Sequence, residues 1–148
     1  YSGGMTIADD KPLSLVHVLS NRIGRAFHGE IETKFGITIS EWRVLMTLAS
    51  EKGVSAAEIT NRWAMEKMMV NRAIQRLVDN GCITRQRDPN DRRRYRLALT
   101  TKGRKLYDKI ALTTNKRYNE LMSAIDSDET DALVRALQKI IQRAEQLN

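Results

Sequence analysis

The sequence predicts a mainly helical α+β fold in which a compact centre lies between long helices. Apolar residues recur three and four positions apart over long stretches near both ends of the chain, as they do in amphipathic helices. Between residues 66 and 99, one helical stretch is followed by two stretches of alternating apolar and polar residues, which is typical of a β-hairpin. The 148 residues suffice for one ordinary domain, so we expect one compact unit with extensions.

The first long helix is expected over residues 13–36. Apolar residues recur with helical spacing through this range, and Gly36 is the expected left-handed residue that ends the helix. Residues 1–12 are interpreted as a tag remnant followed by an N-terminal extension, because Tyr1-Ser2-Gly3-Gly4 before Met5 is typical of a cloning scar.

Two short helices are predicted next, each by a capping box at its N-terminus. Thr38 stands three positions before Glu41, and Ser55 stands three positions before Glu58. A bend then separates the second short helix from a helix that begins at Glu66. The apolar face of that third helix is formed by Val70, Ala73, Ile74 and Leu77.

A hairpin is predicted behind this helix. Asn80-Gly81 is the expected helix stop, residues 82–87 and 95–99 alternate as two half-buried strands, and Asp88-Pro89-Asn90-Asp91 is typical of a turn. Two helices joined by a tight bend and followed by a hairpin form a winged helix-turn-helix, which we assign to residues 37–99.

Residues 100–148 are predicted to form two more helices. Thr100 is the expected cap of the first, and Asp126 with Glu129 forms a capping box for the second. A centre of this size cannot cover the apolar faces of long helices at both ends of the chain. We therefore expect residues 13–36 and 100–148 to be dimerisation helices that pack against a second copy of the chain.

The positive charge is concentrated in one region. The chain has 25 Lys and Arg against 18 Asp and Glu, a net charge of +7. Residues 62–105 hold 13 of the basic and 4 of the acidic residues, whereas the rest of the chain holds 12 against 14. A generally solvated basic surface would spread the charge evenly. The concentration favours a polyanionic partner, most simply nucleic acid.

Several other classes of protein are disfavoured. The single cysteine excludes an intrachain disulfide framework and a multi-cysteine zinc site, and it suits a reducing cytosol. There is no glycine-rich phosphate loop, metal cluster or nucleophile beside a base, so we expect no enzyme, cofactor or metal. No apolar run of about 18 residues is present, so we expect a cytoplasmic protein without a membrane span.

The cysteine and the two histidines have structural and functional interpretations. Cys82 begins a strand at an apolar position, which favours a buried structural thiol over an oxidant sensor. His17 and His28 are eleven residues apart on one helix and cannot share a metal ion within one chain. We expect them to be polar residues of a dimer interface, with an effector pocket as the alternative.

Several segments resemble the MarR family of transcriptional regulators. They are Ile59–Trp63, Val70-Asn71-Arg72, Leu77–Gly81, Asp88–Arg94 and Leu99–Gly103, and the resemblance extends over nearly the whole chain from Leu13. It implies a dimer with interleaved terminal helices that reads a near-palindromic duplex. The helix from Glu66 would lie in the major groove and Arg93 would reach the adjacent minor groove. The chain departs from the family pattern at Met68-Met69, where small hydroxyl residues are frequent, and at Asn71, which replaces a frequent threonine.

The DNA-binding residues are expected on the outward face of the third helix and at the hairpin tip. Arginine pairs with guanine, and asparagine or glutamine with adenine, whereas a first-turn lysine more often meets phosphate. Met68 is interpreted either as a contact to thymine methyl groups or as an incidental exposed side chain, and Gln75 either as a base contact or as a solvated residue. The predicted set is Lys67, Met68, Asn71, Arg72, Gln75, Arg76, Arg92, Arg93 and Arg94.

The hairpin arginines suit the negative potential of a narrow minor groove. By the resemblance, Asp91 orients Arg93, although an acid that only caps its own turn would have the same sequence pattern. Arg85, Arg87 and Arg96 are expected within reach of phosphates.

These observations together predict a dimeric repressor that binds double-stranded DNA and responds to a small effector such as an aromatic acid. The alternative is a constitutive or architectural winged-helix DNA binder without an effector. A winged helix that docks a protein partner is a third interpretation, and it predicts weak salt dependence of DNA binding.

Overall fold

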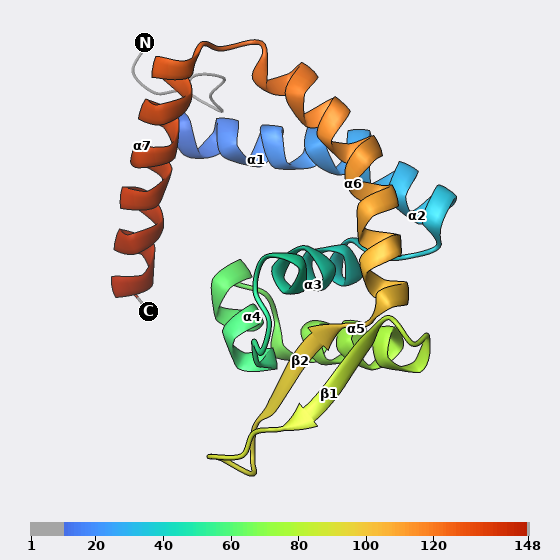
Figure 1. Ribbon diagram of the computed structural model, residues 1–148. Coiled ribbons are helices and arrows are strands. Elements are labelled where there is room, and N and C mark those ends of the chain that lie inside the picture. Colours follow the sequence, from blue (N-terminus) through green and yellow to red (C-terminus); the bar gives the residue numbers. More distant parts are fainter. Residues whose placement is uncertain (1–10, 148) are drawn as a thin grey trace. The chain divides into compact units, whose positions relative to one another are not determined.

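The computed structural model describes residues 11–147, which form two compact units, residues 11–111 and 112–147 (Figure 1). The tag remnant and N-terminal extension proposed for residues 1–12 lie outside the described residues except for Lys11 and Pro12, and Pro12 is the first residue of a helix. None of the described helices is long and apolar enough to cross a membrane. The predicted winged helix-turn-helix is present in the first unit.

The predicted first helix is one helical stretch with three parts: α1 (Pro12–Ile23), a π-helical turn (Gly24–His28) and α2 (Gly29–Phe35). Gly36 ends it with φ +67°, as predicted. The π-helical turn was not predicted. The apolar residues of this stretch follow one another in four-residue steps, which drift around a regular α-helix of 3.6 residues per turn. A wider turn compensates for part of that drift. The members of this series are Leu15, Leu19, Ile23, Phe27 and Ile31.

Three helices form the centre of the first unit: α3 (Ile39–Ser50), α4 (Ala56–Trp63) and α5 (Lys67–Asp79). The capping box of Thr38 and Glu41 is confirmed. The one predicted for Ser55 and Glu58 is only half formed. The Ser55 hydroxyl accepts a hydrogen bond from the Glu58 amide at 3.2 Å, but the Glu58 carboxylate accepts from the side chains of Ser55 and Arg94 instead of from the Ser55 backbone amide.

The hairpin consists of β1 (Ile83–Arg87) and β2 (Tyr95–Leu99), which pair antiparallel with Arg85 opposite Leu97. β1 begins one residue later than predicted. The Leu97 amide donates to Val54 in the loop between α3 and α4, so the base of the hairpin is attached to the helices while its tip projects beyond them (Figure 1). We call β1, β2 and the loop of residues 88–94 the wing.

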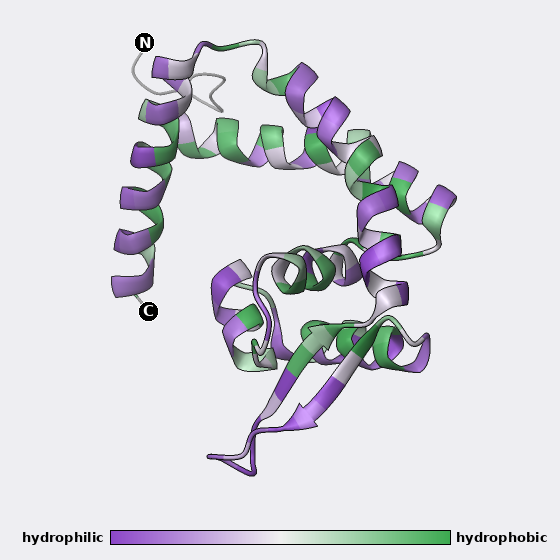
Figure 2. Cartoon of the chain, viewed as in Figure 1, coloured by the Kyte–Doolittle hydropathy of each residue, from purple (hydrophilic) through white to green (hydrophobic). Residues whose placement is uncertain are grey.

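The two C-terminal helices are α6 (Thr101–Met122) and α7 (Ser127–Gln146). The Thr100 hydroxyl caps α6 and the capping box of Asp126 and Glu129 opens α7, both as predicted. Among the residues of α7 that the structure describes, none is buried. Its apolar residues lie along one side of the helix, as Figure 2 shows. The exposed members are Leu133, Val134, Ile140 and Ile141.

Gly103 lies where α6 approaches the start of β1 most closely. A Cβ atom at this position would lie 1.9 Å from the Cys82 carbonyl oxygen, so a side chain forces the backbone apart. We expect Gly103→Ala to destabilise the protein by about 1–3 kcal/mol, measured by urea unfolding.

Gly29→Ala is the matched control for this substitution. Gly29 has an ordinary helical backbone (φ −62°) and nothing within 4 Å of an added Cβ, so alanine should be neutral or stabilising by about 0.4–1 kcal/mol. Equal unfolding midpoints for Gly103→Ala and the unmodified protein would contradict the close approach.

Candidate nucleic-acid interface

The helix predicted to read DNA buries the expected face. Val70, Ala73, Ile74 and Leu77 of α5 are buried, at 0–4% exposure. The predicted DNA-binding residues of the same helix are all exposed, and Met68 is 59% exposed. They are Lys67, Met68, Asn71, Arg72, Gln75 and Arg76.

The first half of this exposed face is available for a ligand. In the part of the chain that the structure describes, the side chains of Lys67, Asn71 and Arg72 make no hydrogen bond or ion pair. Their donors and acceptors therefore face solvent, as base-reading and phosphate-binding groups must before DNA is bound.

The second half of the face is engaged within the protein. The Gln75 amide nitrogen donates to Asp79 Oδ1 at 2.8 Å, and its Oε1 accepts from Arg85 Nη2 at 2.7 Å. Arg76 Nε lies 3.6 Å from Oε1 of the buried Glu41. To contact DNA, Gln75 and Arg76 must either keep these interactions at the same time or exchange them for contacts with DNA.

The wing loop is ordered by its own acidic residues. Asp91 Oδ1 accepts from the Arg93 amide at 3.0 Å and lies 3.7 Å from Arg93 Nε. Asp91 therefore caps its own turn and is also within ion-pair distance of Arg93. The structure thus contains both contacts that the sequence suggested for Asp91. The Arg93 side chain is 93% exposed, which leaves its guanidinium free to enter a groove.

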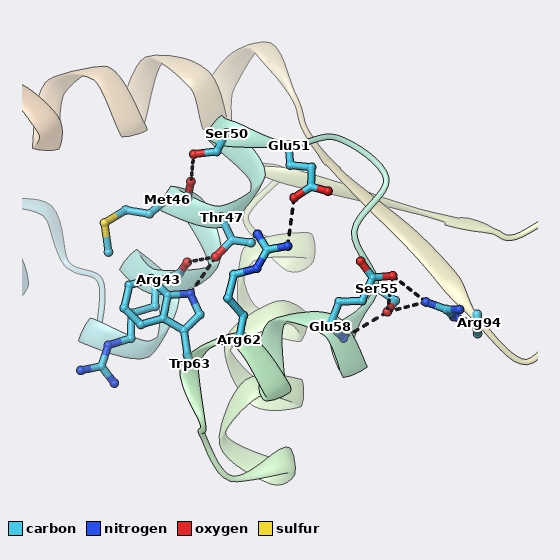
Figure 3. Close-up of polar contacts among 10 residues, drawn as sticks. All are labelled: Arg43, Met46, Thr47, Ser50, Glu51, Ser55, Glu58, Arg62, Trp63 and Arg94. Atoms are coloured by element: carbon cyan, nitrogen blue, oxygen red, sulfur yellow. Dashed lines mark hydrogen bonds and ion pairs between the residues drawn. The ribbon is translucent and has the colours of Figure 1, made fainter. Parts of the chain in front are cut away.

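The three tip arginines differ in their surroundings (Figure 3 shows Arg94). Arg94 Nη2 donates to Glu58 Oε1 at 2.6 Å and to the Ser55 hydroxyl at 3.0 Å. The Arg92 side chain is exposed, and its carbonyl accepts from Arg87. A DNA contact by Arg94 stays a prediction, but its guanidinium already ties the wing to the N-terminus of α4.

Asp88 is a wing residue whose role the sequence analysis missed. Its carboxylate accepts from the Asn90 amide at 2.8 Å and from Arg96 Nε at 3.2 Å. The hydrogen bond from the Asn90 amide has the largest effect and lowers the pKa of Asp88; desolvation, the next largest effect, raises it, and the hydrogen bond and charge of Arg96 help to hold the pKa below its ordinary value. The sequence predicted that Asp88 lies in a turn, but its pairing with Arg96 depends on the strand register, which the sequence does not show.

A cleft between α5, the N-terminus of α4 and the wing brings the predicted residues together. It has a volume of about 370 Å³. Five of the nine predicted DNA-binding residues line it although they are separated by up to 27 positions in the sequence. They are Lys67, Asn71, Gln75, Arg93 and Arg94, and Arg85 lies beside them.

A second cavity, of about 380 Å³, lies between α3 and the end of α4. Trp63 forms one wall, and its indole nitrogen donates to the Thr47 hydroxyl at 2.8 Å. The Arg43 guanidinium lies 5.4 Å from the centre of the Trp63 ring, and Arg62 pairs with Glu51 at 2.9 Å (Figure 3). An aromatic wall and the side chain of Arg62 therefore meet at this cavity.

The remaining candidate residues are the cysteine and the two histidines. Cys82 is buried at 2% exposure, as expected for a structural thiol. His17 is exposed on α1, while His28 is half-buried in the π-helical turn, where burial and then the charge of Arg43 lower its pKa. Residues 11–147 contain no group of His, Cys, Asp and Glu that could hold a metal ion.

Comparison with known sequences places these features in a family. The MarR family model matches residues 35–94, which span the helix-turn-helix and most of the wing. An uncharacterised HTH-type transcriptional regulator of Staphylococcus aureus is 27% identical over 109 residues, which cover 72% of this chain and 75% of that protein. FarR, an HTH-type transcriptional regulator of Neisseria gonorrhoeae, is 26% identical over 112 residues, or 76% and 77% of the two chains.

Solved structures agree with this assignment. A MarR/EmrR family regulator from Acinetobacter sp. ADP1 superposes with a TM-score of 0.82 at 25% identity, covering 90% of this chain and 94% of that one. MepR of S. aureus, solved in complex with DNA, has the same fold, with a TM-score of 0.79 at 21% identity and coverage of 92% and 99%. The order of elements, the wing motif and the matched sequences agree, and the winged helix-turn-helix of this chain is similar to that of the MarR family of transcriptional regulators.

Proposed function

We propose that this protein is a sequence-specific, double-stranded DNA-binding transcriptional repressor that acts in the cytoplasm as a homodimer. The observation that carries the proposal is the surface formed by Lys67, Asn71 and Arg72, whose side chains are unpaired among the described residues, next to the exposed Arg93 of the wing. The helix α5 would enter the major groove, with Asn71 and Arg72 at base edges and Lys67 at a phosphate. Arg93 would enter the flanking minor groove.

The dimer is proposed because apolar side chains of the terminal helices are exposed in a single chain. On α1, Leu13, Leu15, Val18 and Leu19 are all 46–59% exposed, and α7 has the exposed apolar side described above. Covering these faces with a second copy removes apolar surface from water. Two copies of α5 would then read a near-palindromic operator whose half-sites are about one helical turn apart.

Selection of bound sequences from random duplexes tests this function. We expect a near-palindrome, and we expect its affinity to fall steeply with salt because several phosphates are neutralised and release counterions. Recovery of no common sequence together with weak salt dependence would instead favour a winged helix that docks a protein partner.

We further propose that a small aromatic acid controls DNA binding from the second cavity. The Trp63 ring offers an aromatic wall for packing, while Arg62, which also lines the cavity, offers a cation for a carboxylate. The ion pair of Arg62 with Glu51 is half exposed, so it contributes little free energy. Replacing Glu51 by a ligand carboxylate therefore costs little free energy. A ligand held there would favour conformations in which the half-site spacing fits DNA poorly.

Thermal unfolding against a panel of small aromatic acids checks this control. At least one acid should raise the melting temperature and weaken operator binding, because it binds one conformation of the folded protein preferentially. Trp63→Ala should remove the rise in melting temperature, and Met68→Ala, which leaves the cavity lining unchanged, should keep it. No response to any acid would favour the alternative, a constitutive DNA binder without an effector.

A further inference from the structure

Gln75 lies on the DNA-facing side of α5, but its amide group is held by two protein partners. Its Nε2 donates to Asp79 one turn along the helix at 2.8 Å, and its Oε1 accepts from Arg85 of β1 at 2.7 Å. A glutamine that reads adenine must present both atoms to the base at once. Doing so here would break the hydrogen bonds to Asp79 and Arg85, so Gln75 is better suited to a role inside the protein.

The contact of Gln75 with Arg85 continues to the wing loop. The Arg85 guanidinium lies 5.7 Å from the centre of the Tyr95 ring, and the Arg87 guanidinium lies 5.3 Å from the same centre. Arg87 also donates to the Tyr95 hydroxyl and to the Arg92 carbonyl, both at 3.0 Å. Side chains thus connect the middle of α5 to the tip of the wing without interruption.

A second bridge holds the wing from α4. Arg94 Nη2 bonds to Glu58 and Ser55, and both Arg94 and Glu58 are about half exposed (Figure 3). Exposed pairs of this kind add little to stability, so the bridge chiefly orients the loop. The tip is therefore held at two points, one on α5 and one on α4, with Arg93 projecting from the loop between them.

We propose that Gln75, through Arg85, is a positioning residue that fixes the distance between the recognition helix and the wing tip. This inference rests on the proposed function, because the distance matters only if α5 and Arg93 contact one duplex together. It assigns base reading to Met68, Asn71 and Arg72, and it makes Gln75 a determinant of the spacing between the major-groove bases and the flanking minor-groove segment.

The first test uses the DNA-free protein, so that it does not depend on the function. We expect Gln75→Ala to speed amide hydrogen exchange in residues 88–94 severalfold while exchange in α5 stays unchanged, because the wing loses its contact with the helix. Gln75→Glu keeps an acceptor for Arg85 and should keep the wing protected. Unchanged wing exchange in Gln75→Ala would overturn the inference.

The second test uses the selected operator and duplexes with one base pair inserted or deleted between the half-site and its flanking minor-groove segment. The unmodified protein should prefer the parental spacing. Gln75→Ala and Arg85→Ala should each bind the parental duplex about threefold to tenfold more weakly, and should discriminate less between spacings. The double variant should be no worse than either single variant, since both residues act through one contact.

Gln75→Glu is expected to restore the spacing preference. If Gln75→Ala instead relaxes the preference at one base pair and keeps the spacing preference, Gln75 reads a base and the inference is wrong. If the losses of the two single variants simply add, the two residues do not act through one contact, and the inference is equally wrong. A failure of the unmodified protein to bind any duplex would count against the proposed function, while the hydrogen-exchange result would still decide the wing contact.

Discussion

Replacing both Leu133 and Ile140 of α7 by Glu is expected to produce monomers and to weaken operator binding by about 10²–10⁴-fold. The two side chains are 41% and 43% exposed in the single chain and lie seven residues apart on the apolar side of the helix. A carboxylate in a subunit interface loses its hydration without gaining a partner. Without the dimer, each half-site must be bound independently. Sedimentation measures the assembly, and titration with the operator measures the affinity.

A matched control adds the same charge to the opposite side of α7. Gln138→Glu with Gln142→Glu places two carboxylates on exposed polar positions, so it should remain dimeric and bind the operator with nearly unchanged affinity. A stable dimer formed by the Leu133 and Ile140 variant would mean that α7 does not contribute to the interface.

Arg72→Ala is expected to cost about 1–3 kcal/mol on the cognate duplex and to relax the preference at one base pair of each half-site. Arg72 lies on the exposed side of α5 and has no hydrogen bond or ion pair among the described residues, so its guanidinium is available for a guanine edge. Binding measured over all single base-pair changes of the operator would identify the position that it reads.

Two further variants separate base reading from charge. Arg72→Lys keeps the charge but loses the planar pair of donors, so it should keep non-specific affinity and still relax the preference. Arg93→Ala should weaken binding by a similar factor on every half-site sequence and reduce the salt dependence, because it contacts a groove through its shape and charge. A loss from Arg72→Ala that is equal on all duplexes would make Arg72 a phosphate contact.

Local signals in the sequence were sufficient for most of the fold. The capping residues Thr38 and Asp126 and the glycine stops Gly36 and Gly81 act on neighbouring backbone, so the ends of the helices could be predicted from short segments. The apolar face of α5 followed from its periodicity in the same way. The π-helical turn in residues 24–28 was not predicted. The apolar spacing indicates a helix but does not distinguish the hydrogen-bond pattern of a π-helix from that of an α-helix.

Long-range partners could not be read from the sequence. Glu58 was predicted to complete a capping box, but Arg94, 36 residues away, provides a charged partner for its carboxylate. Gln75 was read as solvated or base-reading because its bond to Arg85 exists only once the hairpin has its register beside α5. The sequence therefore predicted which side chains are exposed. It did not predict which of these side chains have hydrogen-bond or ion-pair partners within the protein.

The position of Trp63 gives the protein an internal optical reporter. The chain has two tryptophans: Trp42 is buried at 5% exposure and stacks on Tyr107, while Trp63 is half-buried in the wall of the second cavity. The two indoles therefore differ in polarity of surroundings and should emit at different wavelengths. A molecule that enters the cavity changes the longer-wavelength emission of Trp63 and leaves that of Trp42 as an internal reference, so occupancy can be followed in solution without a label.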